Sequence, residues 1–212
     1  MNEGLRADVD FITEAAPRLA TIATLAAMSF GLADGANEAL KGTNGDERYA
    51  FGWHQAVLGF QDGTLMMAVI RVCISLDSDG KTVSFQGVYK RLLRPEVQRA
   101  LIEKVYGEHE DFQSLFGPAP AQMVEQFLSI YRGIDWDVYA RLLHFRNFGV
   151  AHLLDRKNWK SITYDEMRAL VALVGRLADT LTELCRSSVP PVEPLVKEWT
   201  ELSLQALVKT PK

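Results

Sequence analysis

The sequence predicts an all-α protein, and three observations support that prediction. Apolar residues recur every three to four positions through most of the chain, which is the period of helices with one buried face. No stretch alternates β-branched or aromatic residues with polar ones in the way of a strand. Glycine, proline and short polar clusters stand mainly between the periodic stretches. The chain has 212 residues, 48% hydrophobic and 24% charged, which is enough for one buried core.

Seven helices are expected in this fold. In chain order they cover residues 8–40, 47–76, 85–93, 95–107, 121–152, 164–184 and 195–206. Pro17 is expected to break or kink the first helix, because proline lacks the backbone N–H that an interior helical residue donates. Ser84 precedes the third helix as its N-cap, and Pro95 suits the first turn of the fourth.

The helix over residues 164–184 carries the clearest local signals. Thr163 and Glu166 have the spacing of a capping box, and apolar residues follow at the period of one buried face. A proline-rich connector and a short amphipathic helix occupy residues 189–212, and that helix either docks onto the bundle or supplies a surface for a partner. The sequence thus predicts a helical domain over residues 1–188 followed by this connector and helix.

Composition restricts the compartment and the partners. Cys73 and Cys185 are too few for a disulfide framework and lack the paired spacing of a zinc site, so a cytoplasmic protein without a bound metal or cofactor is expected. The most apolar run, residues 19–33, is expected to be a buried helix and not a membrane span. With a net charge of −4, the chain can bind a polyanion only through a local basic patch.

The expected helix over residues 121–152 places two polar side chains near its buried face. Counting about 100° per residue from Phe127, His152 lies about 20° from the centre of the apolar stripe, and Arg146 lies near its edge at about 100°. The stripe itself consists of Phe127, Ile130, Tyr131, Ile134, Val138, Leu142 and Phe145. A buried guanidinium needs a carboxylate or a bound phosphate as its partner.

Arg146, Asn147 and His152 together have the side chains that metal-free cleavage of a phosphodiester requires. Histidine can move the proton of a ribose 2′-hydroxyl, arginine can stabilise charge on the phosphoryl group, and asparagine can orient either of them. One straight helix does not aim both Arg146 and His152 at one phosphate. We therefore expect either a break at Gly149 or a homodimer that brings two copies of the motif together.

The run Arg146-Asn-Phe-Gly-Val-Ala-His152 resembles the signature of the HEPN superfamily, in which an arginine and a polar residue precede a histidine near the end of a bundle helix. The helix over residues 64–77 and the basic helix over residues 88–93 are similar to its abortive-infection, AbiU-like branch. Ser75 stands where that branch often has arginine, with Arg71 one turn earlier, and Leu154 replaces a tyrosine found in some members. The resemblance implies a HEPN-like helical bundle with additional N-terminal and C-terminal helices.

The resemblance also implies a function. Many members are dimeric, metal-independent endoribonucleases of toxin–antitoxin and phage-defence systems, so RNA as substrate and a possible antitoxin protein as partner are expected. The site would consist of Arg146, Asn147 and His152. RNA phosphates would meet Arg156, Lys157, Lys160 and Arg71, although a solvated basic loop is the alternative for the first three.

Two other functions remain open from the sequence. A HEPN module without catalysis would bind a nucleotide, RNA or a protein through the same groove. A structural adaptor would instead hold Arg146 in an ion pair with an acidic side chain and pack His152 in the core.

Overall fold

The computed structural model of the chain describes residues 2–43, 51–79, 82–107, 119–150 and 162–208. Within these ranges the chain forms helices and no strand, which confirms the predicted all-α class. The elements are α1 Glu3–Gly42, α2 Phe51–Ser75, α3 Phe85–Leu92, α4 Pro95–Tyr106, α6 Pro120–Arg132, α7 Trp136–His144, the π-helix η1 Phe145–Val150, α8 Tyr164–Leu184 and α9 Leu195–Val208.

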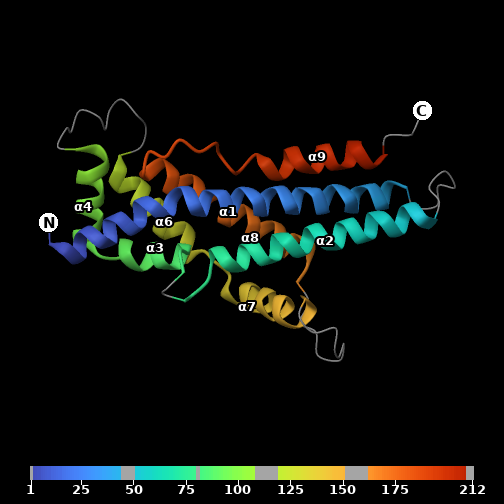
Figure 1. The fold of residues 1–212 in the computed structure, drawn as a ribbon, viewed down its shortest axis with the longest axis horizontal. Helices are drawn as coiled ribbons and strands as arrows, with labels where there is room; N and C mark the ends of the chain where they lie inside the picture. Colours follow the sequence, from blue (N-terminus) through green and yellow to red (C-terminus); the bar gives the residue numbers. More distant parts are fainter. Residues whose placement is uncertain (1, 44–50, 80–81, 108–118, 151–161, 209–212) are drawn as a thin grey trace.

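The long helix α1 forms the axis of the fold, with α2 and α9 lying along it and α8 packed behind it (Figure 1). Alanine and glycine make up much of its buried surface, so the neighbouring helices approach it closely. Of the break or kink expected at Pro17, the break is wrong, because α1 continues through this residue as one helix. The residues around Pro17, among them Ala16 and Leu19, are buried in the core, and their packing outweighs the one lost backbone hydrogen bond.

The predicted starts of α3 and α4 are confirmed, whereas α1 begins at Glu3 and so before the expected residue 8. Ser84 caps α3 by accepting a hydrogen bond from the N–H of Gly87 at 3.2 Å. Pro95 occupies the first turn of α4, and Gly107 ends that helix with a φ of 69°. These signals act within a few residues, which is why the sequence alone is sufficient to place them.

The expected continuous helix over residues 121–152 is wrong. It is divided into α6, α7 and η1. α6 ends at Gly133, and Asp135 caps α7 by accepting hydrogen bonds from the N–H groups of Asp137 and Val138, both at 3.0 Å. The turn keeps the apolar stripe inward, since Phe127, Tyr131, Ile134 and Leu142 are all buried.

The C-terminal helix α9 docks along α1, which decides between the two roles that the sequence left open. The connector before it is anchored, because Val192 is buried against α8 and donates its N–H to the carboxylate of Asp179 at 2.7 Å. α9 then crosses Gly31 and Gly35 of α1, where an added Cβ would lie 2.7 and 2.5 Å from α9 backbone oxygens. Only glycine permits this approach.

Two helices are long and apolar enough to cross a membrane by length and composition, a test that core helices also pass. Buried residues make up 67% of the most apolar window of α1, but only 33% of that of α2. The α1 window is therefore core, as the sequence predicts for residues 19–33. Most of the corresponding window of α2 is not covered by the described part of the chain.

Candidate functional site

Three contacts hold α7 in place at the end of α2. The side chain of Asp135 caps its first turn. In its middle, the hydroxyl of Tyr139 donates a hydrogen bond to the backbone oxygen of Cys73 at 3.3 Å. Arg141 forms an ion pair with Glu166, which belongs to the capping box of α8. These contacts join α7 to α2 and to the start of α8. The turn that follows α7 therefore has a defined position.

That turn is the π-helix η1, and Arg146 and Asn147 lie in its first half. A π-helix closes its hydrogen bonds one residue later than an α-helix does, and such wide turns frequently occur at functional sites. Arg146 is half-buried and Asn147 is exposed. Because the α-helix ends at His144, the rotation of 100° per residue assumed from the sequence does not apply through Arg146.

The guanidinium of Arg146 has an amide as its partner. Its Nε donates a hydrogen bond to Oδ1 of Asn147 at 3.0 Å. Within the described ranges, no carboxylate lies at ion-pair distance from Arg146, unlike Arg141 and Arg168, which each bind one. The positive charge of Arg146 is therefore not neutralised by any of the acidic side chains that the structure describes.

Arg146 also acts on two buried groups next to it. Burial raises the pKa of the Cys73 thiol to about 12, and the nearby charge of Arg146 opposes this rise. Burial raises the pKa of the Tyr139 hydroxyl as well, with Cys73 and Asp77 adding to the effect and Arg146 again opposing it. Both groups stay uncharged at neutral pH. The guanidinium of Arg146 therefore lies beside a neutral thiol and a neutral phenol.

The other sequence-predicted site residues divide into two groups. His152, Arg156, Lys157 and Lys160 lie outside the described residues. Arg71 is described, and its guanidinium donates a hydrogen bond to the backbone oxygen of Leu25 at 3.0 Å and another to the hydroxyl of Ser29. The hydrogen bonds that the structure gives to Arg71 therefore join α2 to α1 and do not extend to η1.

Sequence reasoning missed Tyr139 and Cys73 as neighbours of Arg146. Tyr139 precedes Arg146 by about two helical turns, so its place on the same side of the helix was a readable signal. The contact between Tyr139 and Cys73 could not be read from the sequence, because it joins residues far apart in the chain.

Two hollows lie away from this site. One of about 590 Å³ lies between α1 and α4, with Arg99 and Lys104 among its lining residues. The other, of about 400 Å³, lies between the start of α7 and α8 and has an apolar floor that includes Val138 and Leu170. Neither includes Arg146 or Asn147. Among the residues that the structure describes, no three His, Cys, Asp or Glu side chains cluster so as to hold a metal ion.

Comparisons with protein-family models, with curated proteins and with solved structures find no match to this chain. The function must therefore be argued from the geometry of η1 and from the residue pattern around it.

Proposed function

We propose that this protein is a metal-independent endoribonuclease of HEPN type, acting in the cytoplasm as a toxin or phage-defence effector. The observation that carries the proposal is the state of Arg146. A half-buried guanidinium whose partner among the described residues is a neutral amide retains its full charge for an anion. Because Asn147 engages Nε and the structure gives no other described residue a hydrogen bond to this guanidinium, its two terminal amino groups can bind a phosphate.

The reaction follows from the three residues of the motif. The 2′-hydroxyl of a ribose attacks the adjacent phosphorus, and the bond from phosphorus to the 5′-oxygen of the next nucleotide breaks. His152 takes the hydroxyl proton or gives one to the leaving oxygen, with a second copy of the histidine or water completing the transfer. Arg146 stabilises the charge that develops on the phosphoryl oxygens, and Asn147 orients Arg146. The products are a cyclic 2′,3′-phosphate and a 5′-hydroxyl.

The proposed assembly is a homodimer, as the resemblance to the HEPN superfamily implies, with the motifs of two copies brought alongside each other. Arg156, Lys157 and Lys160 would contact the RNA backbone. A possible antitoxin would act by covering this face of the molecule.

The decisive test is cleavage of end-labelled single-stranded RNA in the presence of a chelator. Arg146→Ala and His152→Ala are each expected to lower the rate at least about 100-fold, and Arg146→Lys should retain part of it. Arg132→Ala is the matched control, because Arg132 is an exposed arginine at the end of α6. It removes the same charge outside the motif and should leave the rate within about twofold.

Two outcomes would overturn the proposal. Cleavage that survives both Arg146→Ala and His152→Ala would assign the activity to another site or to a contaminant. RNA binding that depends on Arg146, without cleavage by the wild type, would instead identify a noncatalytic HEPN module.

A further inference from the structure

Two residues that flank η1 in the chain meet at one carboxylate, that of Glu166. Arg141 lies in α7, five positions before Arg146, and Thr163 is the N-cap of α8. Oε1 of Glu166 accepts a hydrogen bond from the guanidinium of Arg141. Its Oε2 accepts one from the backbone N–H of Thr163 at 2.8 Å and another from the Thr163 hydroxyl at 3.1 Å. The helix that leads into η1 and the start of α8 are thereby joined by one side chain.

The apolar packing at this joint is incomplete. A small hollow of about 40 Å³ lies between α2, the start of η1 and the start of α8. Its lining residues are Leu65, Val69, Phe145, Ile162, Thr163, Tyr164 and Met167. Side chains that line a void lose the dispersion contacts that a filled space would give them. The polar bonds of Glu166 therefore carry a larger share of the connection between η1 and α8.

The position of α7 makes this connection important. α7 lies at the edge of the bundle, with α2 between it and α1 in the view of Figure 1. Its polar contacts reach α2 through Tyr139 and α8 through Arg141, and Arg141 is the nearer of the two to Arg146 along the chain. Nε of Arg141 is buried and has no partner among the described residues, so this guanidinium depends on Glu166.

We propose that Glu166 is a positioning residue, which holds η1 and the guanidinium of Arg146 in place by joining α7 to the first turn of α8. One carboxylate oxygen binds α7 and the other binds the residue that starts α8, so the side chain fixes both helices at once. The hydrogen bond from the backbone N–H of Thr163 lowers the pKa of Glu166, and the charge of Arg141 also lowers it. The carboxylate is therefore ionised at neutral pH, as its bond to a guanidinium requires.

For the proposed nuclease, the consequence concerns the rate of the chemical step, and this consequence rests on the proposed function. A displacement of about 1 Å in a group that stabilises the transition state can lower the rate about 100-fold. Glu166 acts on Arg146 through Arg141 and the end of α7, so it is not itself a catalytic residue. Its loss should lower kcat while the affinity for RNA changes little.

Glu166→Gln separates the two ends of this contact. Glutamine also completes a capping box, because its amide oxygen can accept the hydrogen bond from the N–H of Thr163. It lacks the negative charge that binds Arg141 strongly. Asp165→Asn is the matched control. Asp165 is the neighbouring acid in the first turn of α8, and its ion pair is with Arg168 of the same helix.

Hydrogen exchange of the full-length protein tests the proposal without RNA. In Glu166→Gln the backbone amides of η1 are expected to exchange at least about 10-fold faster than in the wild type, while those in the buried middle of α1 keep their rate. Asp165→Asn should match the wild type at both places. Equal exchange of η1 in Glu166→Gln and the wild type would overturn the proposal. Faster exchange throughout α1 would also overturn it, because the effect would then be a general loss of stability.

A double-mutant cycle identifies the contact responsible. Arg141→Gln is expected to speed exchange in η1 about as much as Glu166→Gln does, and combining the two should add little, because both remove the same bond. Arg141→Lys can still bind the carboxylate and should retain part of the protection. Fully additive effects of Arg141→Gln and Glu166→Gln would overturn the proposal.

The cleavage assay with chelator then separates this proposal from the proposed function. In an active enzyme, Glu166→Gln should lower kcat about 10-fold and leave KM for RNA within about twofold, whereas Asp165→Asn should leave both unchanged. An unchanged kcat in Glu166→Gln would overturn the positioning of Arg146 by Glu166. A wild type that cleaves no RNA, together with the expected exchange pattern in η1, would support the positioning role and overturn only the nuclease.

Discussion

The carboxylate of Asp34 on α1 accepts a hydrogen bond from the guanidinium of Arg168 on α8 at 2.8 Å. The hydroxyl of Thr200 on α9 lies 3.5 Å from the other carboxylate oxygen, so this one side chain joins three helices. The two partners differ in their surroundings. The side chain of Asp34 is 10% exposed, whereas that of Arg168 is 45% exposed and also binds Asp165.

Removing the cation should therefore be the more damaging change. Arg168→Ala leaves a buried carboxylate without its charged partner and is expected to lower the free energy of unfolding by about 2 kcal/mol. Asp34→Asn leaves a guanidinium that water and Asp165 still solvate, so about 1 kcal/mol is expected. Urea denaturation of both variants measures the difference, and a larger loss for Asp34→Asn would contradict this account.

The close crossing of α1 and α9 predicts opposite effects for two glycine substitutions. In Gly35→Ala the new Cβ would lie 2.5 Å from the backbone oxygen of Thr200 and 2.6 Å from Cβ of Ser203, so α9 must shift. We expect a loss of about 1 to 3 kcal/mol and faster tryptic cleavage at exposed Lys197. Gly42→Ala meets no neighbour and should stabilise by up to about 1 kcal/mol. Equal stability and equal cleavage in the two variants would show that the docking of α9 does not depend on glycine at position 35.

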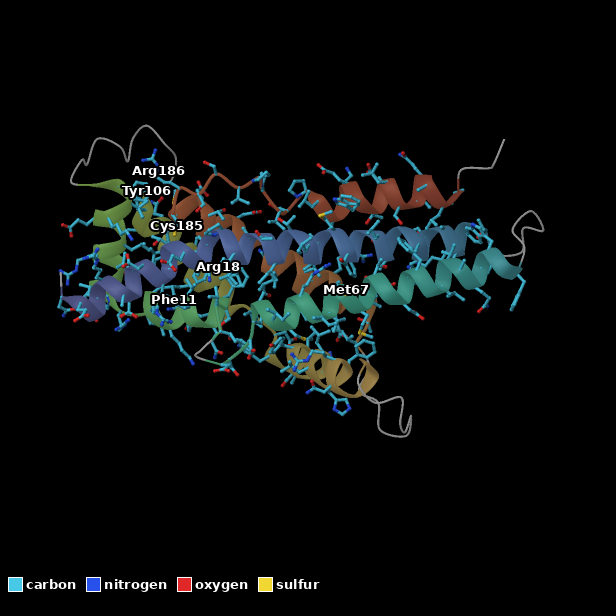
Figure 2. All side chains as sticks on the ribbon, viewed as in Figure 1. Phe11, Arg18, Met67, Tyr106, Cys185 and Arg186 are labelled. Atoms are coloured by element: carbon cyan, nitrogen blue, oxygen red, sulfur yellow. The ribbon has the colours of Figure 1, made fainter. Side chains whose placement is uncertain are left out.

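Arg186 occupies a backbone conformation that favours glycine. Its φ is 51°, and it follows α8 at the position where helices commonly end on glycine. The guanidinium lies over the ring of Tyr106, 5.8 Å from its centre, and Figure 2 labels both residues at the same end of the molecule. Arg186→Gly relieves the backbone strain of the positive φ, and Arg186→Ala does not. Both substitutions remove the contact with the ring of Tyr106. The glycine variant is therefore expected to be about 1 kcal/mol more stable than the alanine variant by thermal denaturation. The reverse order would mean that the backbone is not strained there.

The buried thiol of Cys73 predicts a loss of stability at alkaline pH. Burial raises its pKa from 9.0 to about 12 in the folded chain, so the folded state holds the proton more tightly than the unfolded state does. The stabilisation is complete below pH 9 and declines as the pH rises from there toward 12, by about 1.4 kcal/mol per pH unit for this group. Cys73→Ala should flatten this part of the pH profile. An unchanged slope between pH 9 and 10.5 in the variant would contradict the assignment.

Prediction from the sequence succeeded where the deciding contacts are local. Ser84, Pro95 and the Thr163 capping box act on backbone groups within the first turn of their own helices, and all three helices begin as predicted. It failed at Pro17 and at residues 121–152. At Pro17, packing against distant helices keeps α1 helical through a residue that is unfavourable locally. Over residues 121–152, the uninterrupted apolar stripe favoured one helix, because the turn that Asp135 caps preserves the inward face of the stripe.

The candidate site shows the same division. Arg146 and Asn147 were identified from their spacing and chemistry, and the structure adds the amide partner, the π-helical turn and the neighbouring thiol and phenol. The sequence predicts an amphipathic helix in the segment that forms α9, yet the apolar Leu202 is 54% exposed and the polar Ser203 is buried. The small side chain of Ser203 fits against Gly35, and no pattern within α9 itself indicates that requirement.

The sequence by itself determined that this chain is helical and where several of its helices begin, because periodicity and capping depend on neighbours a few residues away. The tertiary structure decided which apolar faces are covered. Among the described residues, α9 fills the space beside Gly31 and Gly35 of α1, whereas a Cβ at Gly59 or Gly63 of α2 would meet no atom within 4 Å. Burial depends on the surfaces that distant segments present to each other, so a face of α2 that the described residues leave exposed became visible only once the helices were placed.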